Sequence, residues 1–151
     1  MGLLAIYLDN CTYNRPFDDQ TQLRISLETQ AKLYIQTLIK NEKLDLVYSY
    51  VCFYENNINP FENKKLSIQE FSKNAKYFVI ENNDILLKAN KIVKSGIKTL
   101  DALHLSCAIS AKANYFITVD DALLKYHSNE IIILDPIMFI KHWNNLGGKN
   151  E

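Results

Sequence analysis

Short apolar runs alternate along the chain with segments of helical periodicity, and this alternation limits the folds that the chain can adopt. The first run, residues 3–8, is apolar at every position, which is typical of a strand buried on both faces. Further strand-like runs lie at residues 44–48, 77–80, 115–118 and 131–134. Strands buried on both faces need helices on both sides, so the pattern predicts an α/β domain with a parallel sheet.

The helices between these runs have recognisable ends. Ser, Thr, Asp and Asn favour the position before a helix, Pro favours its first turn, and Gly favours the position after its end. From these signals, the predicted helices run from Asp19 to about Lys40, from Ser49 through Glu55, around residues 68–75, from Asn82 to Gly96, from Thr99 to about Lys112, from Asp120 to Tyr126 and from Pro136 through Trp143.

The length and composition favour a single domain. With 151 residues, 48% of them hydrophobic, the chain can bury a substantial core. We expect one domain over residues 1–146 and a flexible tail over residues 147–151. No apolar run approaches the roughly 20 residues of a membrane span, and residues 1–8 show no basic leader. The three cysteines are far apart, which argues against disulfides and a zinc site, so we expect a cytoplasmic protein.

Acidic residues stand where several strands are predicted to end. Asp9 follows the first strand, Glu55 comes shortly after the second, and Asp120 follows a later one. Asp101 lies in the first turn of an apolar helix rich in small residues, where a carboxylate is costly to bury without a partner. Ligands of open parallel sheets bind outside the carboxyl ends of the strands. We therefore expect these four acids to lie close together.

Four neighbouring carboxylates repel one another unless a cation neutralises them. Oxygen ligands with few histidines favour Mg²⁺ or Mn²⁺, whereas zinc prefers His and Cys. A magnesium ion held by a few carboxylates keeps several waters and usually handles phosphate groups. We therefore expect a Mg²⁺ or Mn²⁺ site for phosphodiester hydrolysis, with metal-ligating and catalytic residues Asp9, Glu55, Asp101 and Asp120.

Each of these acids also has an ordinary structural explanation. Asp9 can simply end a strand, and Glu55 can lie on the surface of a helix. Asp101 can interact with the helix dipole, a contribution of about 0.3–1 kcal/mol. Asp120 can cap the helix that follows it, either alone or while also binding a metal. The metal-site interpretation depends on all four acids occurring in the expected order.

Four further side chains lie close to these acids in the sequence. Asn10 and Thr118 are candidates to hydrogen-bond a ligand carboxylate or a substrate phosphate, and a local turn bond explains each equally well. Asp121 competes with Asp120 as the acid after the strand, but the Thr-x-Asp spacing favours Asp120 and leaves Asp121 as the less favoured ligand. His104 follows the helix acid by three residues, and we expect a hydrogen-bonded core histidine rather than a metal ligand.

Positive charge is concentrated in one third of the chain, although the whole chain has a formal net charge of zero. Residues 64–98 contain eight lysines and three acids. Such a basic region can guide an RNA backbone toward an acidic site. Lysines on the solvent face of a helix also need no function, so this alternative stays open.

The chain resembles the PIN domain, the metal-dependent ribonuclease fold of VapC-type toxins. The residues that carry the resemblance are the apolar strand before Asp9, Glu55 on a helix after the second strand, the segment Asp101-Ala-Leu-His-Leu and the motif Thr118-x-Asp120. It extends from about residue 4 to residue 143. It implies a sheet of about five mainly parallel strands, a Mg²⁺ or Mn²⁺ site, cleavage of RNA, a homodimer and, in many members, an antitoxin protein as partner.

The residues after Asp9 depart from that family. Asn10-Cys11 stands where the family commonly has Thr or Ser, and residues 13–19 look like an insertion, so the resemblance is to a divergent subgroup. A catalytically weak PIN-like module that binds RNA or a protein is therefore the second hypothesis. A phosphotransfer domain with Asp9 as acceptor is the third, and it is less favoured because Cys11 stands where a second Asp is needed.

Overall fold

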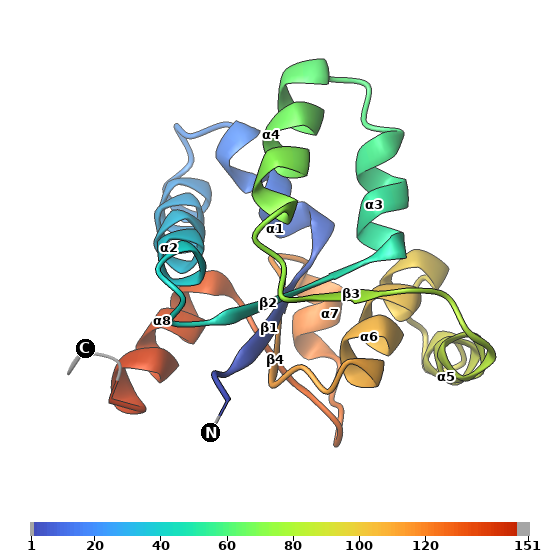
Figure 1. Ribbon diagram of the computed structural model, residues 1–151. Coiled ribbons are helices and arrows are strands. Elements are labelled where there is room, and N and C mark those ends of the chain that lie inside the picture. Colours follow the sequence, from blue (N-terminus) through green and yellow to red (C-terminus); the bar gives the residue numbers. More distant parts are fainter. Residues whose placement is uncertain (1, 148–151) are drawn as a thin grey trace.

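The structure, a computed structural model, describes residues 2–147 and contains one sheet of five parallel strands (Figure 1). The strand order is β3-β2-β1-β4-β5. The strands are β1 (Ala5–Leu8), β2 (Asp45–Ser49), β3 (Tyr77–Val79), β4 (Tyr115–Ile117) and β5 (Ile132–Leu134). This confirms the predicted α/β fold with its parallel sheet. Residues 148–151 of the predicted tail lie outside the described part of the chain.

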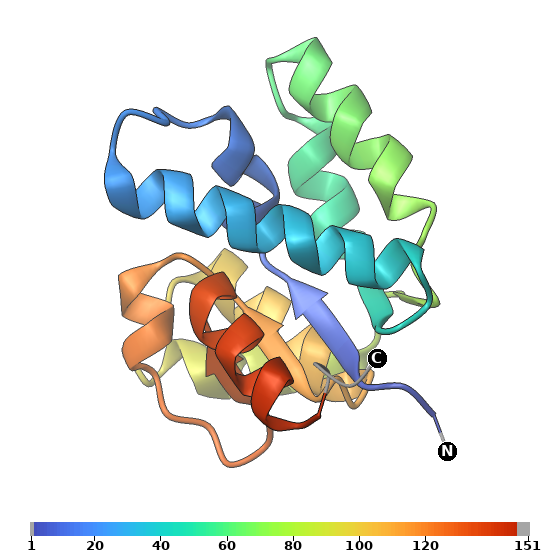
Figure 2. The ribbon, with the colours of Figure 1, turned by 90° about the vertical axis from the view of Figure 1, so that its left-hand side faces the viewer.

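Helices cover both faces of the sheet. Figures 1 and 2 show α2 and α8 side by side on one face, and α5 packs on α6 against the other. The helices are α1 (Asn10–Asn14), α2 (Leu23–Lys40), α3 (Tyr50–Asn57), α4 (Glu62–Ser72), α5 (Asn83–Val93), α6 (Thr99–Ser110), α7 (Asp121–Lys125) and α8 (Pro136–Asn145), with a 3-10 turn η1 (Arg15–Phe17). Among residues 2–147, no helix is long and apolar enough to cross a membrane.

Strand β1 lies at the centre of the sheet, and its side chains are buried on both faces. The Tyr7 ring stacks on Phe116 of β4, with 5.3 Å between the ring centroids. At the start of β1, the Asn114 side chain accepts a hydrogen bond from the Ala5 backbone N–H at 2.8 Å. Because β1, β2 and β4 run in the same direction, their carboxyl ends meet at one edge of the sheet.

Several predicted helix ends are confirmed. Ser49, Asn82 and Asp120 each precede a helix and accept a hydrogen bond from a backbone N–H inside it. Gly96 has φ +98°, the left-handed conformation expected after a helix. These signals could be identified because a cap is made by residues that are neighbours in the sequence.

Two predicted caps are wrong. Asp19 binds the backbone N–H and the hydroxyl of Thr21, at 3.0 and 2.7 Å, and this turn delays the start of α2 until Leu23. Thr99 is the first residue inside α6, and the residue before it makes no capping bond with its side chain. At Asp19 a competing local turn thus replaces the expected cap, whereas α6 begins without a side-chain cap.

Two other features also differ from the prediction. The insertion-like segment, residues 13–19, contains η1, which Arg15 stabilises by pairing with Asp18 at 3.0 Å and with the buried Glu28 at 2.9 Å. Helix α4 begins at Glu62, earlier than the predicted helix around residues 68–75. Its first turn is polar and shows little apolar periodicity.

Replacing Leu105 by Ala tests the core that holds α6 in place. Leu105 is fully buried in the main hydrophobic cluster, and leucine-to-alanine changes at such sites cost about 2–5 kcal/mol. We expect a loss of this size in the free energy of unfolding, measured by urea denaturation. The control Leu66→Ala, at a residue that is 52% exposed, should change it by less than about 0.5 kcal/mol. Equal losses in both variants would contradict the position of α6.

Candidate active site

Asp9 is a buried carboxylate that is held by three donors. It follows β1 directly and caps α1 by accepting a hydrogen bond from the Asn10 backbone N–H at 2.7 Å. The Thr118 hydroxyl donates to the other carboxylate oxygen at 2.9 Å, and the Cys11 thiol contacts the same oxygen at 3.2 Å. Only 3% of Asp9 is exposed, so these bonds are needed to stabilise it. They also fix its orientation.

Cys11 supplies a donor at the position where the sequence departs from the PIN family. Burial, followed by the nearby charge of Asp9, raises the pKa of the Cys11 thiol well above its usual value. The thiol therefore stays protonated and can donate to Asp9. Although Asn10-Cys11 stands where the family commonly has Thr or Ser, the Asp9 carboxylate is still hydrogen-bonded.

Thr118 connects Asp9 to Asp120 at the end of β4. Its hydroxyl donates to Asp9 and accepts from the Asp120 backbone N–H at 3.1 Å. Asp120 caps α7 by accepting from the backbone N–H groups of Ala122 and Leu123. Asp121 pairs with Arg24 at 2.8 Å instead. The structural alternative for Asp120 as a cap is therefore confirmed, and Thr118 contacts both acids.

Asp101 lies in the first turn of α6 and interacts with the other three acids. Its pKa is raised to about 6, first by burial and then by the charges of Asp9 and Asp120, with a smaller contribution from Glu55. His104 acts in the opposite direction. The charges of Asp9, Asp120 and Glu55 thus all act on Asp101, and His104 opposes them. That the four acids form one site stays a prediction.

Glu55 contacts His104 on one side and Asn10 on the other. The Nε2 atom of His104 hydrogen-bonds Glu55 Oε1, and the Asn10 side chain donates to Glu55 Oε2 at 3.4 Å. The same His104 nitrogen lies 3.9 Å from Asp9 Oδ1. Burial alone would lower the pKa of His104, but its contacts with Cys52, Glu55 and Asp9 outweigh burial and raise it. A histidine thus lies between two of the four acids.

His104 is also fixed from the side of the sheet. Its Nδ1 atom is 2.6 Å from the Tyr7 hydroxyl, which is 2.6 Å from the Ser49 hydroxyl. His104 is fully buried and hydrogen-bonded, so the expectation of a core histidine is confirmed. Its contact with Glu55 was not predicted. The available signal was its position three residues after Asp101, which places both on one side of α6.

The donors at this edge suit a hard divalent cation. They are carboxylate oxygens, and the pKa of Asp101 among them is raised first by burial and then by the charges of Asp9 and Asp120. Their present arrangement is not a ready-made cage, because no group of three or more His, Cys, Asp or Glu side chains within residues 2–147 is arranged to hold a metal ion. The donor atoms are of the kind that binds such a cation, but Glu55 is already hydrogen-bonded to His104.

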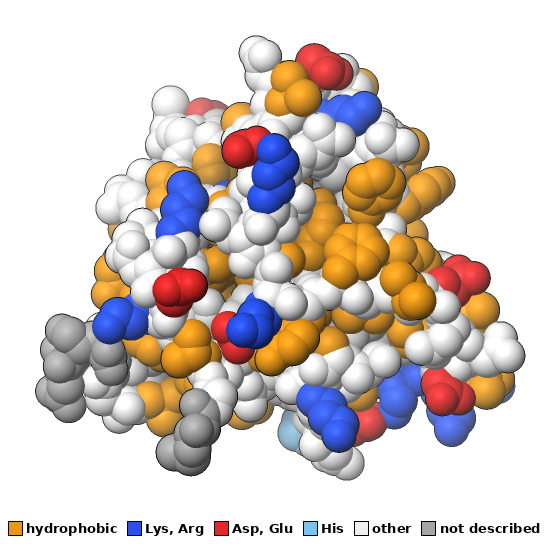
Figure 3. Space-filling model, in the orientation of Figure 1, with side chains coloured by type: hydrophobic (Ala, Val, Ile, Leu, Met, Phe, Trp, Pro, Cys, Tyr) orange, Lys and Arg blue, Asp and Glu red, His pale blue; other side chains and the backbone are white. Residues whose placement is uncertain are grey.

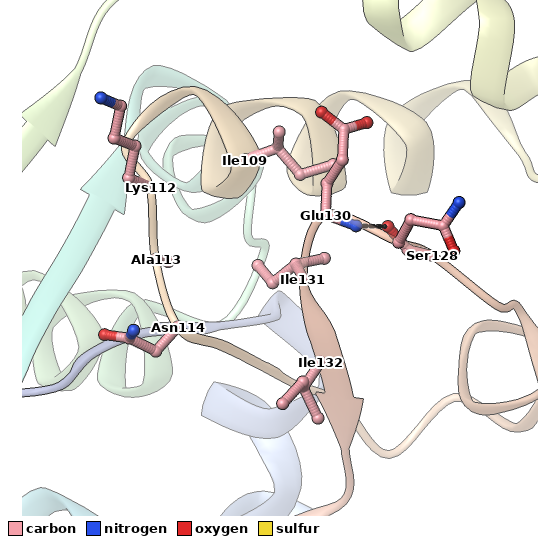
Figure 4. Close-up of a pocket in the computed structure, with 9 residues that line it drawn as sticks. Ile109, Lys112, Ala113, Asn114, Ser128, Glu130, Ile131 and Ile132 are labelled. Carbon is pink, nitrogen blue, oxygen red and sulfur yellow. Dashed lines mark hydrogen bonds between the residues drawn. The ribbon is translucent and has the colours of Figure 1, made fainter.

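One well-formed hollow lies away from these acids. Its cavity, about 630 Å³, lies beside the starts of β4 and β5 (Figure 4). The side chains that Figure 4 labels there include Lys112, Asn114 and Glu130, and Glu130 also pairs with Lys88. No second acid among the described residues converges on Glu130 in this hollow. The candidate site is therefore identified by its chemistry and not by cavity size.

Solved structures with a similar fold support the resemblance seen in the sequence. VapBC2 from Rickettsia felis, in a crystal structure bound to a DNA fragment from its promoter, matches with a TM-score of 0.54 and 14% identity, covering 86% of this chain and 97% of that chain. PAE2754 from Pyrobaculum aerophilum matches with a TM-score of 0.55 and 17% identity, covering 96% of this chain and 98% of that chain. No family model and no curated protein matches the sequence. The structural likeness shows that the chain has a PIN-like fold.

The Asp101→Asn variant tests the crowding of the acids. A carboxyl group whose pKa is raised by folding stabilises the protein at pH values below its unfolded pKa of about 3.9. This contribution is lost as the pH rises through the pKa of the group in the folded state, which for Asp101 is about 6. In chelator, Asp101→Asn should therefore gain stability relative to the wild type between pH 4 and pH 7. Since Asp101 is only partly buried, we expect a gain of about 1 kcal/mol in urea unfolding after allowing for solvent screening.

The matched control is Asp84→Asn, because Asp84 is an exposed acid in the first turn of α5. This control removes the same kind of interaction with a helix dipole. A difference between Asp101→Asn and the wild type that stays constant with pH would contradict the crowding.

Proposed function

We propose, starting from the PIN-like fold, that the chain is a Mg²⁺- or Mn²⁺-dependent endoribonuclease that hydrolyses RNA phosphodiester bonds. The observation that carries the proposal is the placement of the acids at the carboxyl ends of the strands: Thr118 contacts both Asp9 and Asp120, and His104 lies between Asp9 and Glu55. The pKa of Asp101 beside them is raised first by burial and then by the charges of Asp9 and Asp120. Acids held in this way are stabilised by a divalent cation, and such cations serve phosphate chemistry. The fold alone does not specify the activity.

In this proposal Asp9, Glu55, Asp101 and Asp120 would hold the ion. When bound, the ion would make water a stronger nucleophile and neutralise the charge that develops on the phosphate. The protein's own contribution is orientation. The Thr118 hydroxyl and the Asn10 backbone fix Asp9, and these contacts would keep its carboxylate pointed at the same place during turnover.

His104 has a positioning role in the same proposal. It holds the Glu55 side chain in place, and Tyr7 holds His104 through the other ring nitrogen. Its positive charge next to Glu55 and Asp9 offsets part of the repulsion among the acids. The site could therefore persist without a metal and would still favour a cation, because one imidazolium cannot balance four carboxylates.

A second candidate function is a PIN-like module that binds RNA or protein with little or no catalysis. The observation in its favour is that Glu55 is bound by His104 and that the described acids form no ready-made cage for a metal. In this second candidate function, the chain has the same fold but does not cleave RNA. The cleavage experiment below separates the two.

We also propose that the chain acts as a homodimer with an antitoxin protein as partner. The support for the antitoxin is the likeness to VapBC2, which was crystallised with promoter DNA. A small open reading frame directly beside the gene would favour this role over that of a housekeeping nuclease. Co-expression of the two products, followed by size-exclusion chromatography with light scattering, measures both associations.

Cleavage of RNA is the direct test. Purified protein is incubated with a mixture of single-stranded and structured RNAs in Mg²⁺ or Mn²⁺, with and without chelator. We expect cleavage that the chelator abolishes, and a loss on the order of 100-fold or more in Asp9→Asn and Asp101→Asn, because each removes charge at the reacting centre. The exposed variant Asp84→Asn should cleave like the wild type. Cleavage that persists in chelator would reject the proposal, and RNA binding without cleavage in any divalent ion would favour the second candidate.

Metal binding can be measured without following activity. A ligand that binds only the folded state at 100 times its Kd adds about 2.7 kcal/mol of stability, which for a chain of this size corresponds to a rise of about 5–10 °C in Tm. We expect such a rise with Mn²⁺ for the wild type and almost none for Asp101→Asn. Asp84→Asn again serves as the matched control. Equal rises in wild type and Asp101→Asn would show that the ion binds elsewhere.

A further inference from the structure

A second hollow lies directly beside Glu55 and has a lining unlike that of the acidic site. Its cavity is about 370 Å³, within the range of about 300–1,000 Å³ that is typical of small-ligand pockets. One wall comes from α1 and η1, and the other from the connection between α3 and α4. Asn10 and Glu55 lie on its inner side, and Phe61 and Lys64 line its outer side. The hollow therefore joins the candidate active site to an aromatic surface.

Two exposed phenyl rings meet one lysine here. The Lys64 Nζ atom is 4.4 Å from the ring centroid of Phe61 and 5.7 Å from that of Phe17. Phe61 is 59% exposed and Phe17 is 37% exposed. Among the described residues, the other rings that contact a lysine, those of Tyr13 and Phe71, are buried. Within residues 2–147, an exposed aromatic pair that shares a cation thus occurs only here. Phe61 and Lys64 line the hollow, and Phe17 lies beside it, one residue before the lining residue Asp18.

Local structure holds both rings in place. The Asn59 side chain accepts a hydrogen bond from the Phe61 backbone N–H at 3.1 Å, and Pro60 between them restricts the backbone. On the opposite wall, the carbonyl of Arg15 accepts a bond from Thr29 of α2, which fixes the turn that carries Phe17. The acid at the rim, Asp18, is paired with Arg15. Its charge is therefore partly neutralised.

Other exposed apolar side chains have different surroundings. Figure 3 shows hydrophobic side chains gathered over α3 and β3, and those with large exposed fractions include Phe53, Phe78 and Ile80. In the described part of the chain, no lysine or arginine stacks on the rings of Phe53 and Phe78. That surface has no feature that specifies an occupant, whereas the hollow beside Glu55 combines exposed rings, a cation and a neighbouring acidic site.

We propose that Phe61, Phe17 and Lys64 form a subsite for an unpaired base of single-stranded RNA, next to the phosphate that is cleaved. Bases stack on exposed aromatic rings with little regard to sequence, and a lysine beside them neutralises the backbone phosphate. Bases in a duplex are already stacked on each other and cannot enter. The subsite rests on the proposed ribonuclease function, because it assigns the RNA strand a path to Glu55.

Binding is measured in an Asp101→Asn background, in Mg²⁺, so that the RNA stays intact. The probe is a short single-stranded RNA with one 2-aminopurine, whose fluorescence falls when the base stacks. Fluorescence anisotropy gives the Kd, and quenching reports stacking. We expect Phe61→Ala to raise the Kd by about 10-fold or more and to remove the quenching, while Phe61→Tyr retains both. Phe17→Ala should have a smaller effect in the same direction.

The dependence on salt separates the roles of the ring and the lysine. For single strands, log K falls with log salt concentration at about 0.7 per phosphate neutralised. Lys64→Ala should therefore reduce this slope by about 0.7, and Phe61→Ala should leave the slope unchanged. The matched controls are Phe78→Ala, because Phe78 is 54% exposed on β3, and Lys73→Ala at the end of α4. Circular dichroism confirms that every variant is folded.

Three results would overturn the subsite: no binding of single-stranded RNA by the parent protein, an unchanged Kd in Phe61→Ala, or an equally strong effect of Phe61→Ala on duplex RNA. The outcomes also separate the subsite from the proposed function. If Phe61 controls binding but the chain with Asp101 intact never cleaves RNA, the subsite stands and the ribonuclease proposal fails. If that chain cleaves RNA and Phe61→Ala changes neither binding nor cleavage, the ribonuclease proposal stands and the subsite fails.

Discussion

The hydrogen bond between the Tyr7 hydroxyl and Nδ1 of His104 joins the central strand to α6, and the arrangement of the acids depends on it. Both residues are fully buried, so breaking the bond would leave polar atoms without water or a partner. With Nδ1 engaged, the ring is oriented so that Nε2 faces Glu55 and Asp9. The same bond sets how α6 docks on the sheet. In that way it also sets the distance of Asp101 from the end of β1.

The balance of charge at this edge differs from that elsewhere in the molecule. Glu28 is buried too, but it is paired with both Arg15 and Arg24, so its charge is matched. At the candidate site, four carboxylates face one histidine. A surplus of negative charge is a poor way to stabilise a fold, and it is the expected form of a site that binds a cation. In the proposed metal site, Glu55 would have to give up or share its contact with Asn10, because both of its oxygens are engaged.

Local features could be predicted from the sequence, and features that depend on docking could not. The strands and the caps at Ser49 and Asn82 depend on neighbouring residues, and so does the apolar strand before Asp9. The predicted cap at Asp19 is wrong because a turn to Thr21 competes with it, and the predicted cap at Thr99 is wrong because α6 starts at Thr99 itself. The expectation that the acids converge followed from the parallel sheet. The bond between Glu55 and His104 joins α3 to α6, and the contact of Lys64 with two rings requires η1 and α4 to meet, so neither leaves a pattern in the sequence.

The place of β1 in the sheet has a consequence for the time course of folding. The strand is synthesised first and lies at the centre, yet its partner Asn114 comes 109 residues later. At ribosomal rates of about 5–20 residues per second, roughly 5–20 s pass before β4 can pair with it. During this interval β1 can pair only with β2, and one of its edges remains open to other chains. The central strand of the sheet therefore gains its second neighbour only after β4, in the last third of the described residues, has been made.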